Sequence, residues 1–170
     1  NLQGTSTQID DDLKILSKSI QKLSLDTGVG FDKIAEATKS FATIGFSAKE
    51  SLEGAVGATK LSVVLFGDAS ETANAFARSL KILLDTSKEA IPIQEQMARA
   101  FQLTSELEKS NQFNIDEVNE SLIRFAPTAK AAGISMENTL RLLAALGTAG
   151  LTGARGGTLL SSTVGKLREN

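Results

Sequence analysis

The chain has 170 residues, of which 41% are hydrophobic and 22% charged, and its formal net charge is −2. Its length is that of about one domain, and its composition is that of a globular protein rather than a disordered chain. It contains no cysteine and no histidine, which excludes disulfides, thiolate nucleophiles and the commonest general base and transition-metal ligand. We therefore expect no catalytic, cofactor-binding or metal-binding residue.

The charge and the apolar pattern argue against a nucleic-acid-binding protein and against a membrane-spanning protein. A pI of about 5.3 is unlike that of a dedicated nucleic-acid binder, so we expect no specific nucleic-acid binding. The longest charge-free stretch, 142–154, is shorter than the roughly 20 residues of a membrane span, and no secretory signal opens the sequence, so we expect a soluble protein. Six phenylalanines lie at apolar helical positions and are expected in the core: Phe31, Phe41, Phe66, Phe76, Phe101 and Phe125.

The first predicted helix follows Ile9. Apolar residues recur every three or four positions from Leu13 to Leu23, the period of an amphipathic helix. Aspartates 10–12 precede this stripe, where the helix dipole favours carboxylates. We interpret Asp12 as a helix cap; the alternative, a metal ligand, is disfavoured because consecutive carboxylates point in different directions. Residues 1–8 are expected to be a disordered or extraneous lead.

Glycines separate the second and third predicted helices. The second begins at Phe31 and stops at Gly45, a residue suited to the left-handed conformation that follows a helix. Ser47 and Glu50 form a capping box that opens the third helix. The end of this helix, 61–66, is apolar nearly all round and is expected to be the most buried part of the first half.

Two details of the third helix follow from residue type. A strand at 63–65 is the alternative to its last turn, because β-branched residues favour sheets, but no partner strand is evident. The small residues at 54–58 are expected to let a neighbouring backbone approach closely. Helix is therefore the preferred assignment.

The remaining helices also have recognisable starts. Capping signatures occur at 68–71 and 114–117, Pro92 suits a first helical turn, and Ser135 restarts the chain after a glycine. Pro127 is expected to kink its helix rather than end it. The predicted fold is all-α, with about eight short amphipathic helices in hairpins joined by Gly-rich turns and no sheet.

One local pattern occurs twice. Residues 45–47 and 133–135 both read glycine, apolar residue, serine, and each is preceded by a helix that starts with an apolar–acidic pair, at 31–34 and 115–118. The spacing from start to turn differs by four residues, about one helical turn. We infer that a two-helix unit has been used twice.

The glycine-dense segment 150–158 is the one stretch that invites a functional motif. It lacks the lysine of a phosphate-binding P-loop and follows a helix rather than a strand, and it does not fit the dinucleotide fingerprint. A helix N-terminus beside Arg155 that holds an anion is the alternative to a tight interhelical turn. We favour the turn, from Gly150 to Gly157.

Other chemistry-bearing residues are interpreted as structural. Nucleophilic catalysis through Ser87 and Lys88 lacks a predicted oxyanion hole, and no histidine base is available. Paired carboxylates of the glycosidase type are conceivable, but all candidates lie on polar faces or at helix starts and are expected to be solvated. These candidates are Glu106, Glu108, Asp116, Glu117 and Glu120. We therefore predict that the chain is not an enzyme and binds no cofactor.

Several segments together resemble the conserved core region of tailed-bacteriophage tape measure proteins, over roughly residues 20–168. The matching segments are 31–37, 45–50, 114–118, 125–137, 143–153 and 156–159. In that family an APxAxxxGxS segment leads into an alanine- and leucine-rich helix and then a glycine turn followed by GTxLR. This chain departs from the family in its more basic turn at Arg155 and in Leu160, which replaces the usual arginine.

The resemblance implies a structural virion protein with no enzymatic activity. Tape measure proteins lie in the lumen of the tail tube, set its length during assembly with tail chaperones in the host cytoplasm, and leave the tail before the genome is ejected. Implied partners are the tail tube protein, the assembly chaperones, tail tip or baseplate proteins and further copies of the chain. Contact with the host membrane during ejection is a further hypothesis.

We expect residues 9–170 to form a single helical module, with candidate halves at 9–87 and 92–170, within a much longer tape measure polypeptide. One continuous helix of this length would reach about 255 Å at 1.5 Å per residue. Glycines every 15 to 20 residues or so exclude such a rod, and no sustained heptad repeat is present. A generic α-helical protein–protein interaction module is the alternative function.

Overall fold

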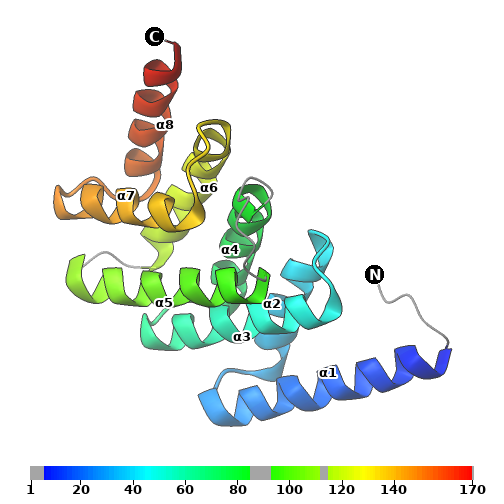
Figure 1. The fold of residues 1–170 in the computed structure, drawn as a ribbon. Helices are drawn as coiled ribbons and strands as arrows, with labels where there is room; N and C mark the ends of the chain where they lie inside the picture. Colours follow the sequence, from blue (N-terminus) through cyan, green and yellow to red (C-terminus); the bar gives the residue numbers. More distant parts are fainter. Residues whose placement is uncertain (1–5, 85–92, 112–114, 170) are drawn as a thin grey trace.

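The structure, a computed structural model, describes residues 6–84, 93–111 and 115–169 (Figure 1). Eight helices and no strand occur in these ranges, so the all-α class and the expected number of helices are confirmed. The helices are α1 (Ser6–Thr27), α2 (Phe31–Thr43), α3 (Ala48–Val64), α4 (Ala69–Leu84), α5 (Ile93–Asn111), α6 (Ile115–Ala131), α7 (Met136–Thr148) and α8 (Gly153–Glu169).

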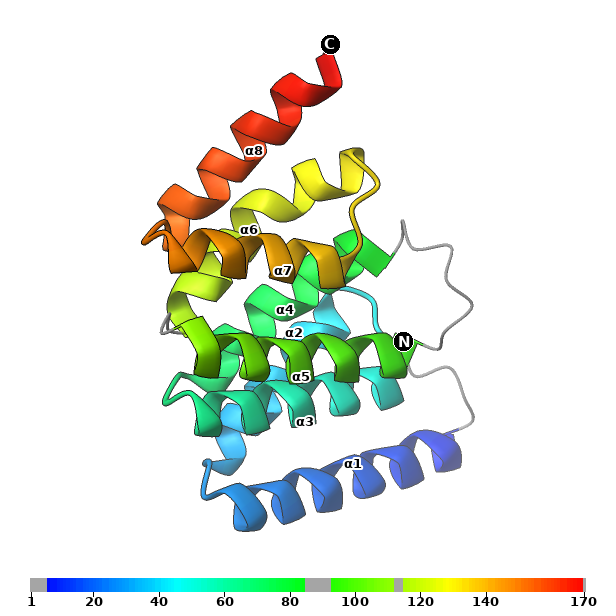
Figure 2. The same cartoon turned by 60° about the vertical axis from the view of Figure 1, so that its left-hand side comes forward.

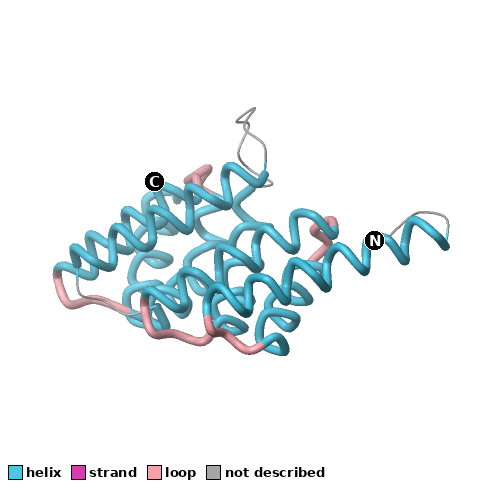
Figure 3. Tube along the Cα trace, turned by 90° about the horizontal axis from the view of Figure 1, so that it is seen from below, coloured by secondary structure: helices cyan, strands magenta, loops and turns pink. Residues whose placement is uncertain are grey.

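The helices form two layers. Each helix from α1 to α6 packs against the helix two positions further along the chain, so the odd-numbered and the even-numbered helices form separate rows. Figure 2 shows α1, α3, α5 and α7 stacked in one row, and Figure 3 shows short loops at the edges of the stack. An amphipathic helix must bury its apolar stripe, and here it does so against the opposite layer and the adjacent helices of its own row.

One continuous core runs from α2 to α8. Its aromatic contacts include Phe41 edge-on to Phe46, with ring centroids 5.6 Å apart, and Phe76 stacked on Phe101 at 4.8 Å. A smaller cluster under α1 contains Ile20, Leu23 and Ile34.

The small residues of α3 admit side chains rather than a backbone. A Cβ on Gly54 would lie 2.6 Å from the ring of Phe41, and one on Gly57 would clash with the ring of Phe101. The expectation of a close backbone approach at 54–58 was therefore wrong, because two aromatic rings fill the space.

Two of the six phenylalanines are not in the core. Phe31 is exposed at the start of α2, and Phe66 is 98% exposed after α3. In the stretch expected to be the most buried, Leu61 and Leu65 are buried, but three residues are exposed: Val63, Val64 and Phe66. This expectation was wrong because only one side of the end of α3 is covered by other helices.

Several helix ends are as expected. Ser47 and Glu50 form the reciprocal capping box of α3, and Ser135 caps α7 through the backbone N–H of Asn138. Gly45 and Gly133 have positive φ angles of 96° and 69°.

Two further predictions concern prolines and a third capping signature. The helix α6 continues through Pro127, as predicted. The signature at 114–117 begins with Asn114, which, like Pro92, lies outside the described residues.

The first helix begins earlier than its apolar stripe. The backbone is helical from Ser6, so Asp12 lies within α1 and the interpretation of Asp12 as a cap was wrong. Nothing between Ser6 and Ile9 breaks a helix, which allows the helical backbone to extend past the stripe. The expected lead overlaps this helix at 6–8, and residues 1–5 lie outside the described part.

The two halves of the stack have matching helix boundaries. The first residues of α2 and α6, Phe31 and Ile115, are 84 residues apart, as are those of α4 and α8, Ala69 and Gly153. The last residues of α1 and α5 have the same spacing. Helices α2 and α3 have 13 and 17 residues, whereas α6 and α7 have 17 and 13. In the second half, the second helix is therefore about one turn longer and the third helix about one turn shorter than in the first half. This difference accounts for the four-residue difference in the sequence pattern.

Candidate functional site

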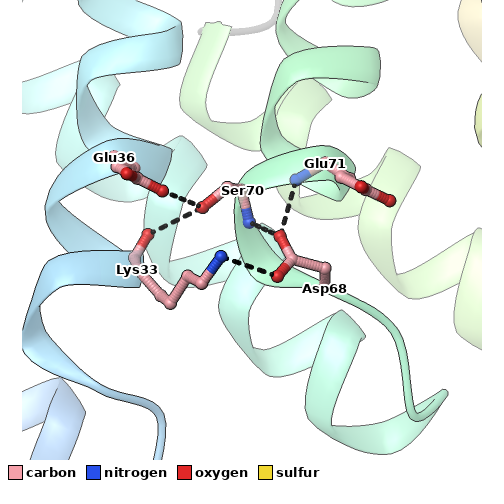
Figure 4. A network of polar contacts seen from close by, with 5 residues as sticks. All are labelled: Lys33, Glu36, Asp68, Ser70 and Glu71. Atoms are coloured by element: carbon pink, nitrogen blue, oxygen red, sulfur yellow. Dashed lines mark hydrogen bonds and ion pairs between the residues drawn. The ribbon is translucent and has the colours of Figure 1, made fainter.

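A polar network joins the starts of α2 and α4 (Figure 4). The Lys33 ammonium lies 3.1 Å from an Asp68 carboxylate oxygen. The other Asp68 oxygen accepts from the backbone N–H groups of Ser70 and Glu71, at 2.8 and 3.0 Å. The Ser70 hydroxyl lies 2.9 Å from a Glu36 carboxylate oxygen and 3.4 Å from the carbonyl oxygen of Lys33.

The network shifts the titration of both members of its ion pair. A hydrogen bond to Asp68, followed by the charge of that carboxylate, raises the pKa of Lys33 above its ordinary 10.5. Burial acts to raise the pKa of Asp68. The hydrogen bonds from Glu71 N–H, Lys33 and Ser70 N–H outweigh burial, so the pKa of Asp68 lies below its ordinary 3.8.

This arrangement anchors helices. Asp68 is held in its charged form as the cap of α4, so it is unsuited to general acid–base work near neutral pH. The capping residue was predictable from the signature at 68–71. Lys33 and Glu36 were not, since they lie more than 30 residues earlier and only the fold brings them to the cap.

The glycine-dense segment lies at the equivalent place between α6 and α8. The helix α8 already begins at Gly153, so the turn is shorter than the predicted 150–157. The Glu120 carboxylate accepts from the backbone N–H of Ala154 at 3.1 Å, and Glu117 accepts from the Thr152 hydroxyl at 2.8 Å. The start of α8 thus has a carboxylate from the same chain where the sequence left open a bound anion.

The two later glycines of this segment serve helix packing. A Cβ on Gly157 would lie 2.7 Å from the carbonyl oxygen of Ser121, and one on Gly156 would clash with the carbonyl of Leu151. The buried Ser121 hydroxyl donates to the carbonyl of Gly153 at 2.7 Å. The close approach of α8 to α6 requires glycine at 157, and the preceding turn requires it at 156. Both glycines belong to the helix rather than to the turn.

The carboxylates considered for catalysis have different surroundings. Asp116 and Glu120 are exposed, as expected, and Glu117 is half-buried. The expectation did not include the contacts that Glu117 and Glu120 make with the start of α8. Glu106 is exposed and accepts from the side chain of Gln102. The side chain of Glu108 lies outside the described part of the structure.

The remaining candidates do not form a metal or catalytic cluster in the described residues. Ser87 and Lys88 lie outside the described ranges, as does the side chain of Asp12. Arg155 is exposed on α8. In the described part of the chain, no three side chains of the metal-binding types come together as a metal site requires.

A groove between α3 and α5 is a second candidate site. Its volume is about 410 Å³, and its mainly apolar lining includes Val56, Met97 and Phe101. Glu53 also lines it, and one oxygen of this carboxylate is buried without a hydrogen-bond partner. An apolar groove between two helices is the kind of surface that receives the apolar face of a partner helix. Among the described helices, each is too short or too polar to cross a lipid bilayer.

Comparison with known proteins gives two matches. Residues 17–170 match the family described as phage-related minor tail protein. A tape measure protein of Pneumococcus phage Dp-1 is 24% identical over 145 residues, which cover 85% of this chain. The aligned region is 12% of that protein, so the chain spans about an eighth of its curated relative. No solved structure matches the chain.

Proposed function

Since this chain belongs to the phage-related minor tail protein family, we propose that it is a folded segment of a tail tape measure protein, with a structural role in the tail. The family match over residues 17–170, which confirms the resemblance inferred from the sequence, is the observation that carries this proposal. The groups at both helix junctions hold helices together, which agrees with a structural rather than an enzymatic role.

The segment contributes to tail assembly as a stacked module, and the length ruler lies in other parts of the polypeptide. The longest described helix, α1, has 22 residues and so extends over about 33 Å at 1.5 Å per residue. The helices of the described ranges lie side by side instead of end to end (Figure 2). Adding or removing such a module therefore changes contacts in the tail more than its length.

We place the segment in the virion, in the lumen of the tail tube, after assembly in the host cytoplasm. Its partners there are the tail tube protein, tail assembly chaperones, tail tip or baseplate proteins and other copies of the chain. The exposed polar faces of the helices and the groove between α3 and α5 provide surfaces for these contacts.

A role in genome ejection is the finer part of the proposal. The amphipathic helices, joined by short loops, unpack and expose apolar faces when the protein leaves the tail, and these faces contact the host membrane. Liposome flotation of the chain at low and neutral pH tests the membrane step. Flotation with the vesicles is expected, and a protein that stays in the soluble fraction under every condition would contradict it.

An α-helical interaction module is the second candidate function, and the groove between α3 and α5 favours it. A module of this kind binds a partner helix whether or not it is part of a tail. Detection of the chain in purified tails by mass spectrometry separates the two functions, because only the tail protein is a virion component. A peptidoglycan hydrolase domain is a third class, tested by zymography, in which we expect no cleared zone.

In-frame removal of residues 6–169 from the phage or prophage that encodes the chain tests the structural role. We expect defective or missing tails by electron microscopy and a loss of infectivity. A Gly165→Ala variant is the matched control, since nothing lies within 4 Å of the added Cβ, and it should assemble normally. Normal tails and full infectivity after the deletion would contradict the proposal.

A further inference from the structure

The two ends of the stack expose residues whose counterparts are buried at its centre. The 84-residue correspondence of helix boundaries pairs α1–α4 with α5–α8. It also pairs the polar contacts: Lys33 and Glu36 meet the start of α4 as Glu117 and Glu120 meet the start of α8. Each half is therefore one four-helix unit, and the junction of α3–α4 with α5–α6 shows how one unit packs on the next.

The α8 end has an uncovered apolar stripe. On α4, which packs against α6, Ala75 and Leu83 are only 2% and 1% exposed. Their counterparts on α8, Leu159 and Leu167, are 41% and 73% exposed. In the described structure α8 packs mainly against α6 and less extensively against α7.

The α1–α2 end has the opposite half of such a junction. Ile115 at the start of α6 is 1% exposed and packs where a Cβ on Gly67, in the α3–α4 turn, would meet it. Its counterpart Phe31, at the start of α2, is 43% exposed. Met97 of α5 is 1% exposed and borders α3, whereas its counterpart Leu13 on α1 is 47% exposed.

We propose that the α7–α8 end of one copy docks on the α1–α2 end of a second copy, in the register in which α3–α4 packs on α5–α6. Both partial surfaces are then buried as their counterparts are. The net charges of the two ends are opposite in sign, since α7 and α8 contain four basic and two acidic residues and α1 and α2 contain five basic and six acidic residues. Because this interface joins two different surfaces head to tail, a pair of copies keeps one free end of each kind, to which further copies can add.

The inference deepens the proposed self-association and depends on the repeat geometry. It can fail while the structural role in the tail stands, because the two are tested by different experiments. Sedimentation velocity of the purified chain over a range of concentrations is the first measurement. The average mass is expected to rise with concentration.

Two variants test the direction of docking. Leu167→Lys alters one end and Phe31→Lys the other, with the same charge so that the altered ends repel each other. Each variant alone is expected to be monomeric, with association weakened at least about tenfold. An equimolar mixture is expected to form heterodimers and no longer chains, because one intact end of each kind remains. Circular dichroism verifies that both variants are folded.

Phe66→Lys is the matched control, since Phe66 is the most exposed of the described phenylalanines and lies on neither end. It is expected to associate like the unaltered chain, whereas non-specific apolar aggregation would be reduced by all three changes. A chain that is monomeric at every concentration, a mixture that stays monomeric, or a control that loses association would each overturn the proposal.

Discussion

The α2–α4 and α6–α8 junctions occupy the same place in two equivalent units but are held together differently. In the first, Lys33 and Asp68 form a partly exposed ion pair, and α4 is capped by its own carboxylate. In the second, α8 receives its carboxylate from Glu120 on another helix and lies close to α6 through glycine. In both units a carboxylate meets the start of the fourth helix, but the helix that supplies it differs.

The largest expected effect is at the close-packed junction. Gly157→Ala places a methyl group 2.7 Å from the carbonyl oxygen of Ser121, so α8 must move away from α6. We expect a loss of about 1–3 kcal/mol in the free energy of unfolding, measured by chemical denaturation. The control Gly165→Ala, in open space on the same helix, should stabilise by up to about 1 kcal/mol. Equal effects of the two changes would refute the close-packing explanation.

The next effect concerns the buried hydroxyl of the same junction. Ser121→Ala leaves the carbonyl of Gly153 without its 2.7 Å donor, and Ala37 is the equivalent residue in the first unit. We expect a loss of about 1–2 kcal/mol in thermal or chemical unfolding. Ser162→Ala, an exposed control on α8, should change stability by less than about 0.5 kcal/mol. A neutral Ser121→Ala variant would show that the hydrogen bond is dispensable.

A change in the opposite direction is expected at the turn after α3. Phe66 has a φ of 55°, whereas its counterpart Gly150 has 72° without the steric cost of a side chain. Phe66→Gly should therefore stabilise the fold by about 1 kcal/mol in chemical denaturation. Phe66→Ala is the matched control, because it removes the ring but keeps the Cβ, and it should gain much less. Equal gains would assign the effect to the exposed ring.

The smallest effect is expected at the exposed ion pair. Asp68→Asn keeps a capping side chain and loses the charge, so the loss at neutral pH should be at most about 1 kcal/mol. Because the pKa of Asp68 is lowered on folding, its stabilisation is present above pH 3.8 and is lost as the pH falls through the folded pKa. Denaturation curves of the two proteins should therefore converge in acid.

At alkaline pH, stability is lost as the pH rises instead of as it falls. The pKa of Lys33 is raised above 10.5, so its stabilisation is present below pH 10.5 and is lost as the pH rises through the folded pKa. A constant difference between Asp68→Asn and the unaltered protein at every pH would contradict the role of the charge. Asp32→Asn, on the same helix as Lys33, controls for a general loss of acidic charge.

Local features of this fold were predictable from the sequence, and features that depend on neighbouring helices were not. The capping box at Ser47 and the left-handed Gly45 are determined by residues within one turn, so the pattern identifies them. Burial of Phe31 or Phe66 depends on which helix covers that face, and periodicity indicates only that an apolar face exists. Both residues were assigned to the core and are exposed.

The junctions show the same division. Asp68 was recognisable as a cap, but its partner Lys33 comes from a helix two positions earlier. Glu120 was assigned to a solvated face because its contact with Ala154 spans 34 residues. The glycines at 156–157 were assigned to a turn, since glycine has the same sequence signal whether it supplies a backbone angle or close helix packing.

The tail length of a phage carrying an in-frame duplication of residues 6–169 tests most directly whether this segment is a stacked structural module. Because the helices lie side by side, the tail should lengthen by much less than about 1.5 Å per duplicated residue. A tail that lengthens by the full rise of a continuous helix would show that the segment spans the tube as a ruler, and would contradict the account.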